Sequence, residues 1–177
     1  MKACIYRQED ALPIIRESEL DLISYSAEQT RALGVRLGVL LRKGDVICLT
    51  GDMGAGKTVF TSGLGIGWGA TTPITSPTFN LVHQHRRQSD RSVLYHLDCY
   101  RLRGVQDVDS IGLDDILDDQ GVVVLEWAER IKEGLPKEHL WVEFRVREEN
   151  RRNLLMEAVG ARYQALLDDF RASLTRT

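Results

Sequence analysis

The chain has 177 residues, 43% of them hydrophobic and 28% charged, which is typical of one folded domain with its own core. Its net charge of −3 argues against a protein that grips nucleic acid through its own electrostatic field. No apolar run approaches the roughly 20 residues of a membrane helix, and charged residues come too early for a secretory signal.

The cysteines indicate a reducing compartment. Cys4, Cys48 and Cys99 are odd in number, widely spaced and free of any CxxC pair. This pattern fits reduced thiols better than a disulfide framework or a zinc site. We therefore expect a cytoplasmic protein without a membrane partner.

We expect a single domain over residues 1–177. Residues 1–22 lack clear periodicity and are predicted to be an N-terminal extension or an edge element. Residues 26–29, Ser-Ala-Glu-Gln, form a capping box and so predict the start of a helix. The apolar positions of that helix are Leu33, Val35, Leu37 and Leu40. It is most simply a packing helix before the first buried strand.

A phosphate-binding loop follows that strand. Residues 46–49 are a short apolar run after a turn, and Gly51–Thr58 match the pattern G-x-x-x-x-G-K-S/T. Glycines let the backbone turn its N–H groups toward phosphate oxygens. Lys57 would reach the β- and γ-phosphates, and the Thr58 hydroxyl would bind Mg²⁺. A plain glycine turn is the alternative, but the strand–loop–helix context favours the phosphate site.

The helix after the loop is predicted from spacing and weakened by composition. Phe60, Leu64 and Trp68 fall on one helical face. Each glycine in this stretch weakens the helix by about 1 kcal/mol relative to alanine. These glycines are Gly63, Gly65, Gly67 and Gly69.

Two interpretations of residues 75–79, Thr-Ser-Pro-Thr-Phe, remain open. A hydroxyl in this segment could sense the γ-phosphate through a metal ion, as switch segments do. A Ser-Pro turn that joins a helix to a strand is equally compatible with the sequence. Residues 79–102 then resemble two strands with a polar loop, so part of the sheet is predicted to be antiparallel.

Two strands end in acids suited to Mg²⁺. Alternation places His96 and Asp98 on one face of the strand that begins at Val93. Without a third ligand, a zinc pair is disfavoured, and His96 is typical of a core histidine. Residues 121–126 predict a buried parallel strand with Glu126 at its ligand-facing end. Glu126 would hold the Mg²⁺ shell or orient water, or else form an ion pair with Arg130.

The remaining segments favour packing roles. The aspartates between 107 and 119 break the EF-hand pattern and fit the solvated face of a short helix. That helix would carry Ile111, Ile116 and Leu117. Residues 160–177 predict a C-terminal packing helix. Its apolar face comprises Tyr163, Leu166, Leu167 and Phe170. The absence of an N-K-x-D segment in the sequence favours adenine over guanine.

Five segments resemble the TsaE (YjeE-type) family, in order and with similar spacing, over residues 26–145. They read GDVICLTGDMGAGKT, TSPTFNLV, YHLDCYRL, IGLDDIL and VVLEWAERI. The resemblance implies an α/β, three-layer P-loop NTPase fold with a mostly parallel sheet. It also implies Mg²⁺ and ATP as cofactors and slow hydrolysis that partners stimulate. The implied partners are TsaB and TsaD, which place threonylcarbamoyl on adenosine 37 of tRNAs that read ANN codons. Contact with tRNA would come only through that complex.

The same resemblance implies roles for particular residues. Catalytic roles fall to Lys57, Asp98 and Glu126, and metal binding to Thr58, Asp98 and Glu126. The nucleotide-binding set comprises Thr30, Gly51, Asp52, Met53, Gly54, Ala55, Gly56, Lys57, Thr58, Thr78 and Trp127. Thr30 would lie near the adenine, and Ser76, Pro77 and Thr78 in the switch-like segment. Packing alone would also explain Trp127, and Cys99 stands where the family usually has an aliphatic residue.

Two other functions share these features. A small-molecule kinase would need an arginine-rich lid, for which Arg86, Arg87 and Arg91 in a hairpin loop are a poor candidate. A non-hydrolysing ATP-dependent switch would bind ATP and change its affinity for partners. Arg101 could act as an arginine finger in cis, or a partner could supply one.

Overall fold

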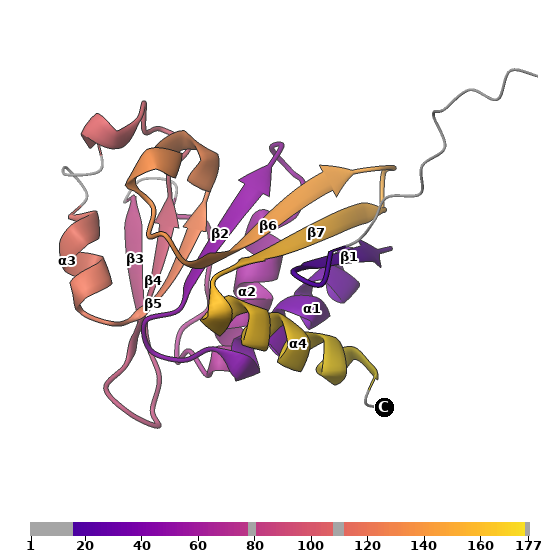
Figure 1. Ribbon diagram of the computed structural model, residues 1–177, viewed down its shortest axis with the longest axis horizontal. Coiled ribbons are helices and arrows are strands. Elements are labelled where there is room, and N and C mark those ends of the chain that lie inside the picture. The colour runs from indigo at the N-terminus through magenta and orange to yellow at the C-terminus, as the bar shows by residue number, and fades with distance from the viewer. Residues whose placement is uncertain (1–15, 78–80, 108–111, 176–177) are drawn as a thin grey trace, which may run out of the picture.

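A computed structural model describes residues 16–77, 81–107 and 112–175, and these form one seven-stranded sheet (Figure 1). The order of the strands across the sheet is β1-β7-β6-β2-β5-β4-β3. The strands are β1 (Glu19–Ser24), β2 (Val46–Gly51), β3 (Val82–Arg86), β4 (Val93–Asp98), β5 (Val122–Glu126), β6 (His139–Val146) and β7 (Arg152–Val159).

The centre of the sheet is parallel and both of its edges are antiparallel. Strand β2 pairs in parallel with β5 and β6, and β5 with β4. Strand β3 runs antiparallel to β4, β7 to β6, and β1 to β7. The mostly parallel sheet with an antiparallel portion is therefore confirmed. The predicted hairpin supplies only one antiparallel edge, and β1 and β7 form the other.

Helices cover both faces of the sheet. They are α1 (Ala27–Leu40), α2 (Lys57–Trp68), α3 (Leu113–Asp118) and α4 (Ala161–Thr175), with the 3-10 segments η1 (Val105–Asp107) and η3 (Ala128–Gly134). Alternate residues of β2 point to opposite faces. Ile47 and Leu49 join one core with residues of α1, α2 and α4, whereas Val46 and Cys48 join another with α3 and η3. Figure 1 shows α3 beyond β3 and the other three helices near β6, β7 and β1. The predicted three-layer arrangement is confirmed.

The N- and C-terminal segments of the described chain flank β7. Strand β1 takes up the end of the predicted extension 1–22 and continues to Ser24, and α4 lies within the predicted segment 160–177. All four predicted apolar residues of α4 are buried, namely Tyr163, Leu166, Leu167 and Phe170. No helix among the described residues is long and apolar enough to cross a membrane.

Two polar contacts attach α4 to the start of β2. The carboxylate of Asp45 is buried, and Oδ2 lies 2.6 Å from Nη2 of Arg162. The Tyr163 hydroxyl accepts a hydrogen bond of 2.8 Å from the backbone N–H of Val46. The Tyr163 hydroxyl satisfies the buried N–H of Val46, and the Arg162 guanidinium neutralises the buried charge of Asp45. Together they fix the end of β2 that is remote from the phosphate-binding loop.

The glycines of α2 allow its backbone to touch that of α1. A Cβ atom at Gly63 would lie 2.0 Å from the carbonyl oxygen of Arg31, and one at Gly34 would lie 2.2 Å from that of Phe60. Gly38 and Gly67 make equivalent approaches. The glycines that weaken α2 as an isolated helix are therefore what lets it pack at this distance, and this packing sets the position of its first turn.

Gly63→Ala is expected to lower the thermal midpoint of unfolding by roughly 5 °C or more, because overpacking against a backbone costs about 1–3 kcal/mol. At an open helical position the same change would stabilise by about 1 kcal/mol, so even the sign is informative. Calorimetry provides the measurement. Ile66→Ala, an exposed position on the same helix, is the control and should stay within about 2 °C. A raised midpoint for Gly63→Ala would contradict the close packing.

Candidate functional site

The loop Gly51–Thr58 joins β2 to α2 in a conformation that depends on glycine. Gly51, Gly54 and Gly56 have φ angles of +124°, +74° and +107°. At Gly51 a Cβ would also lie 2.2 Å from the carbonyl oxygen of Phe144. Gly56 precedes α2 and offers no capping side chain, so the first N–H groups of this 12-residue helix remain available to an anion.

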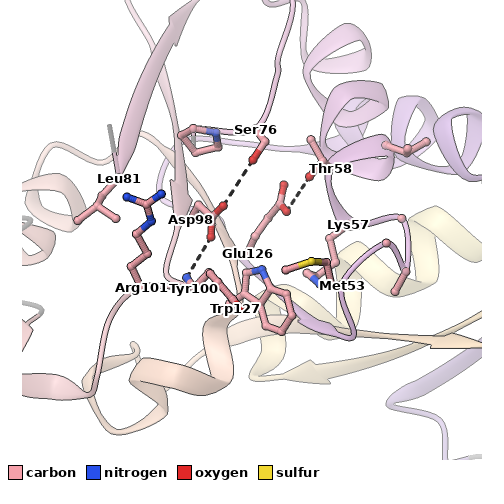
Figure 2. A pocket seen from close by; sticks show the side chains of 15 residues that line it. Met53, Lys57, Thr58, Ser76, Leu81, Asp98, Tyr100, Arg101, Glu126 and Trp127 are labelled. Atoms are coloured by element: carbon pink, nitrogen blue, oxygen red, sulfur yellow. Dashed lines mark hydrogen bonds between the residues drawn. The ribbon is translucent and has the colours of Figure 1, made fainter. Parts of the chain in front are cut away.

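A cavity of about 410 Å³ opens beside this loop, at the carboxyl ends of β2, β4 and β5 (Figure 2). Nine of the predicted site residues line it, namely Met53, Gly54, Ala55, Gly56, Lys57, Thr58, Asp98, Glu126 and Trp127. The other lining residues are Val59, Ser76, Pro77, Leu81, Tyr100 and Arg101. The loop, both predicted acids and part of the predicted switch segment therefore border one space.

Glu126 is almost wholly buried, with 2% of its surface exposed. Its Oε2 accepts a hydrogen bond of 2.8 Å from the Thr58 hydroxyl (Figure 2). Its Oε1 lies 2.9 Å from Nε2 of His96 and accepts a longer bond of 3.4 Å from Thr61. The alternative ion pair with Arg130 is not formed, since that guanidinium lies over the ring of Tyr100.

Asp98 lies beside Glu126, because the register of β4 and β5 pairs the two residues directly. Its Oδ1 accepts a hydrogen bond of 3.0 Å from the backbone N–H of Tyr100, and its Oδ2 one of 3.5 Å from Ser76 (Figure 2). Glu126 therefore contacts the loop and α2, whereas Asp98 contacts the segment that precedes β3.

Lys57 is 4% exposed and its ammonium group is held within its own loop. Nζ donates to the carbonyl oxygens of Gly51 at 2.6 Å and Asp52 at 2.9 Å. It also lies 3.7 Å from the centre of the Trp127 ring. Burial lowers the pKa of Lys57, while nearby carboxylates, first that of Glu126, raise it. Phosphate oxygens would replace neutral carbonyls by charged acceptors, which bind an ammonium more strongly.

Trp127 has an unusual backbone for a residue other than glycine, with φ at +60°. This left-handed conformation costs about 1–2 kcal/mol. It directs the indole toward the cavity, where it contacts Lys57 and lies 4.9 Å from the ring of Tyr100. Packing and a position near the nucleotide, the two explanations of this tryptophan, are thus compatible with each other.

Three predicted residues of the described chain, Thr30, Gly51 and Asp52, do not line the cavity, and a fourth lies outside that chain. Gly51 ends β2 and gives its carbonyl oxygen to Lys57. Thr30 is buried beneath the loop, and its hydroxyl bonds to Ser24 and to the carbonyl of Ser26. The backbone carbonyl of Asp52 accepts hydrogen bonds from Lys57 and from the N–H of Ala55. Thr78 lies outside the described residues.

The oxygen ligands of this site fit Mg²⁺. A hydroxyl and one or two carboxylates, completed by phosphate oxygens and water, are the usual protein environment of that ion. Thr58, Glu126 and Asp98 supply such a set at one end of the cavity. Among the residues described, no three His, Cys, Asp or Glu side chains could hold a metal ion by themselves.

Two polar neighbours of Glu126 were not predicted from the sequence. Thr61 follows Thr58 by three residues, a spacing that places both on one side of a helix. His96 precedes Asp98 by two residues and so shares its strand face. His96 is buried, as a core histidine should be, but it contacts the site. In both cases the signal available in the sequence was the spacing from a residue already assigned to the site, Thr58 for Thr61 and Asp98 for His96.

Comparison with known proteins identifies the family. The family model of the threonylcarbamoyl adenosine biosynthesis protein TsaE matches residues 24–154. The Bacillus subtilis tRNA threonylcarbamoyladenosine biosynthesis protein TsaE is 37% identical over 142 residues, covering 80% of this chain and 87% of that protein. The Streptomyces coelicolor protein of the same name is 44% identical over 111 residues, covering 62% and 74%.

A solved structure extends the comparison to the fold. The crystal structure of Bacillus subtilis YdiB superposes with a TM-score of 0.72 at 34% sequence identity, covering 87% of this chain and 95% of that one. The sequence match thus coincides with the segment that carries the loop, both acids and the central strands. The chain belongs to the TsaE family.

Proposed function

We propose that this protein is a Mg²⁺-dependent ATPase subunit that supports a TsaB–TsaD pair in threonylcarbamoyladenosine formation. The modified base would be adenosine 37 of tRNAs that read ANN codons, with tRNA contacted only through the complex. Membership of the TsaE family supports the pathway. One observation carries the ATPase assignment, namely the 2.8 Å hydrogen bond from Thr58 in the phosphate-binding loop to the buried Glu126.

That hydrogen bond prepares both residues for a metal ion. Because the Thr58 hydroxyl uses its one O–H to donate a hydrogen bond to Glu126, the lone pairs of its oxygen would be available to Mg²⁺. Glu126 and Thr58 would hold the ion together, and the hydrogen bond between them keeps the hydroxyl oriented. Bound Mg²⁺ would offset charge on the phosphates and so make the γ-phosphoryl group easier to attack.

Asp98 is suited to orient the water molecule that attacks the γ-phosphate. Its carboxylate borders the cavity and accepts a hydrogen bond from Ser76, and the N–H of Tyr100 fixes its other oxygen. In the proposed mechanism it orients the attacking water, while Lys57 and the loop N–H groups hold the phosphates. Arg101, which also lines the cavity, is the proposed cation in cis.

Among the rival functions, the kinase finds little support in the described arginines. Arg87 pairs with Asp90 and lies over the ring of Trp68, away from the cavity. Arg86 and Arg91 do not line the cavity either. The non-hydrolysing switch shares every contact described above, so turnover distinguishes it from the ATPase.

Lys57→Ala is expected to weaken ATP binding by roughly a hundredfold or more, because one buried cation that faces the phosphates is lost. Isothermal titration calorimetry with Mg-ATP measures this. Lys43→Ala, an exposed lysine in the turn before β2, is the matched control and should bind as the parent protein does. Unchanged affinity in Lys57→Ala would remove the loop from nucleotide binding.

Glu126→Gln is expected to keep ATP binding in the absence of Mg²⁺ within about threefold and to reduce phosphate release by roughly a hundredfold. The amide is close in size but has lost the charge, and one of its two heteroatoms is a donor. Glu129→Gln, an exposed position three residues later, controls for loss of charge nearby. A Glu126→Gln protein with full turnover would exclude this carboxylate from the mechanism.

A further inference from the structure

We propose that His96 is a positioning residue that fixes the orientation of the Glu126 carboxylate and, through it, of the Thr58 hydroxyl. This inference rests on the proposed function, because it concerns how the chain's own residues prepare the Mg²⁺ site. The observation behind it is a chain of two hydrogen bonds. Nε2 of His96 lies 2.9 Å from Oε1 of Glu126, and the other oxygen accepts from Thr58.

The burial of His96 argues against a role in packing alone. Its side chain is fully buried on β4, between β5 and the edge strand β3, and Nδ1 has no hydrogen-bond partner among the described residues. A buried polar atom without a partner costs free energy that leucine at the same place would avoid. Within the described part of the chain, the one hydrogen bond that the ring makes is to Glu126, so the geometry supports a role in holding that carboxylate.

The proton arrangement follows from the partner. An ionised carboxylate only accepts hydrogen bonds, so Nε2 of His96 must carry the proton. Three donors then surround Glu126, from β4 and from two turns of α2. Because His96 and Thr61 take Oε1, Oε2 is left to Thr58. Without His96, the carboxylate would be free to rotate toward Thr61 and release the hydroxyl.

His85 offers a matched control. It is also a buried histidine of the β3–β4 hairpin, with 6% of its surface exposed, and its Nε2 likewise lacks a partner in the described chain. Its Nδ1, however, lies 2.9 Å from the Thr72 hydroxyl, and it makes no hydrogen bond to Glu126. Loss of a buried histidine in this hairpin can therefore be separated from loss of the contact with Glu126.

The experiment compares His96→Leu, His96→Gln and His85→Leu with the parent protein. The dissociation constant of ADP is measured by calorimetry with saturating Mg²⁺ and again with excess EDTA. In His96→Leu, the gain in affinity from Mg²⁺ should fall by roughly tenfold or more, the usual effect of losing a group that orients a metal ligand. The affinity in EDTA should stay within about threefold, because the loop is intact.

The other variants sharpen the interpretation. Glutamine can still donate an N–H, so His96→Gln should recover most of the Mg²⁺ effect, and His85→Leu should behave as the parent does. A normal Mg²⁺ effect in His96→Leu, or an equal loss in His85→Leu, would overturn the proposal. A parent protein with no Mg²⁺ effect at all would instead contradict the proposed function.

A measurement on the unaltered protein holds even where a variant fails to fold. Long-range ¹H–¹⁵N NMR of the histidine rings reports which nitrogen carries a proton. The proposal requires a protonated Nε2 on His96, with a signal that shifts in the Glu126→Gln protein. An unprotonated Nε2 would overturn it, because that ring could not donate to an ionised Glu126.

Discussion

The parallel pairing of β4, β5 and β2 is the constraint on which the site depends. Parallel neighbours place their carboxyl ends at one edge of the sheet, and here those ends carry Asp98, Glu126 and the start of the phosphate-binding loop. Because β5 is an interior strand between β2 and β4, Glu126 is buried and needs hydrogen-bond donors nearby. Thr58, Thr61 and His96 are those donors, so the burial of one carboxylate organises three elements around the cavity.

The packing of α1 on α2 makes that organisation possible. Thr58 can reach Glu126 only if the first turn of α2 lies close to β5, and the glycine contacts between the helices determine where α2 lies. The buried Thr30 of α1 belongs to the same arrangement, since its methyl carbon would lie 3.7 Å from a Cβ atom at Gly56. The close contact between the backbones of α1 and α2 therefore also determines where the Thr58 hydroxyl lies in the site.

Much of this architecture could be predicted from local patterns. The loop, the buried strand ending in Glu126 and the helix carrying Phe60 each have a short signature that depends on neighbouring residues. The pairing of β7 with β1 and the contact of His96 with Glu126 join residues far apart in sequence, and no local pattern encodes them. The glycines of α2 were predicted only to weaken that helix, because the contact they allow is with another helix, α1, and the local sequence does not show it. The switch-like role of Thr78 stays a prediction.

The proposed activity has its most direct test in phosphate release from Mg-ATP by the purified protein, alone and with the matching TsaB–TsaD pair. The account predicts slow release alone and a clear rise with the pair. No release in either case, despite binding of ATP, would contradict the ATPase and leave a nucleotide-dependent switch. Transfer of phosphate to an added metabolite rather than to water would contradict it in favour of a kinase.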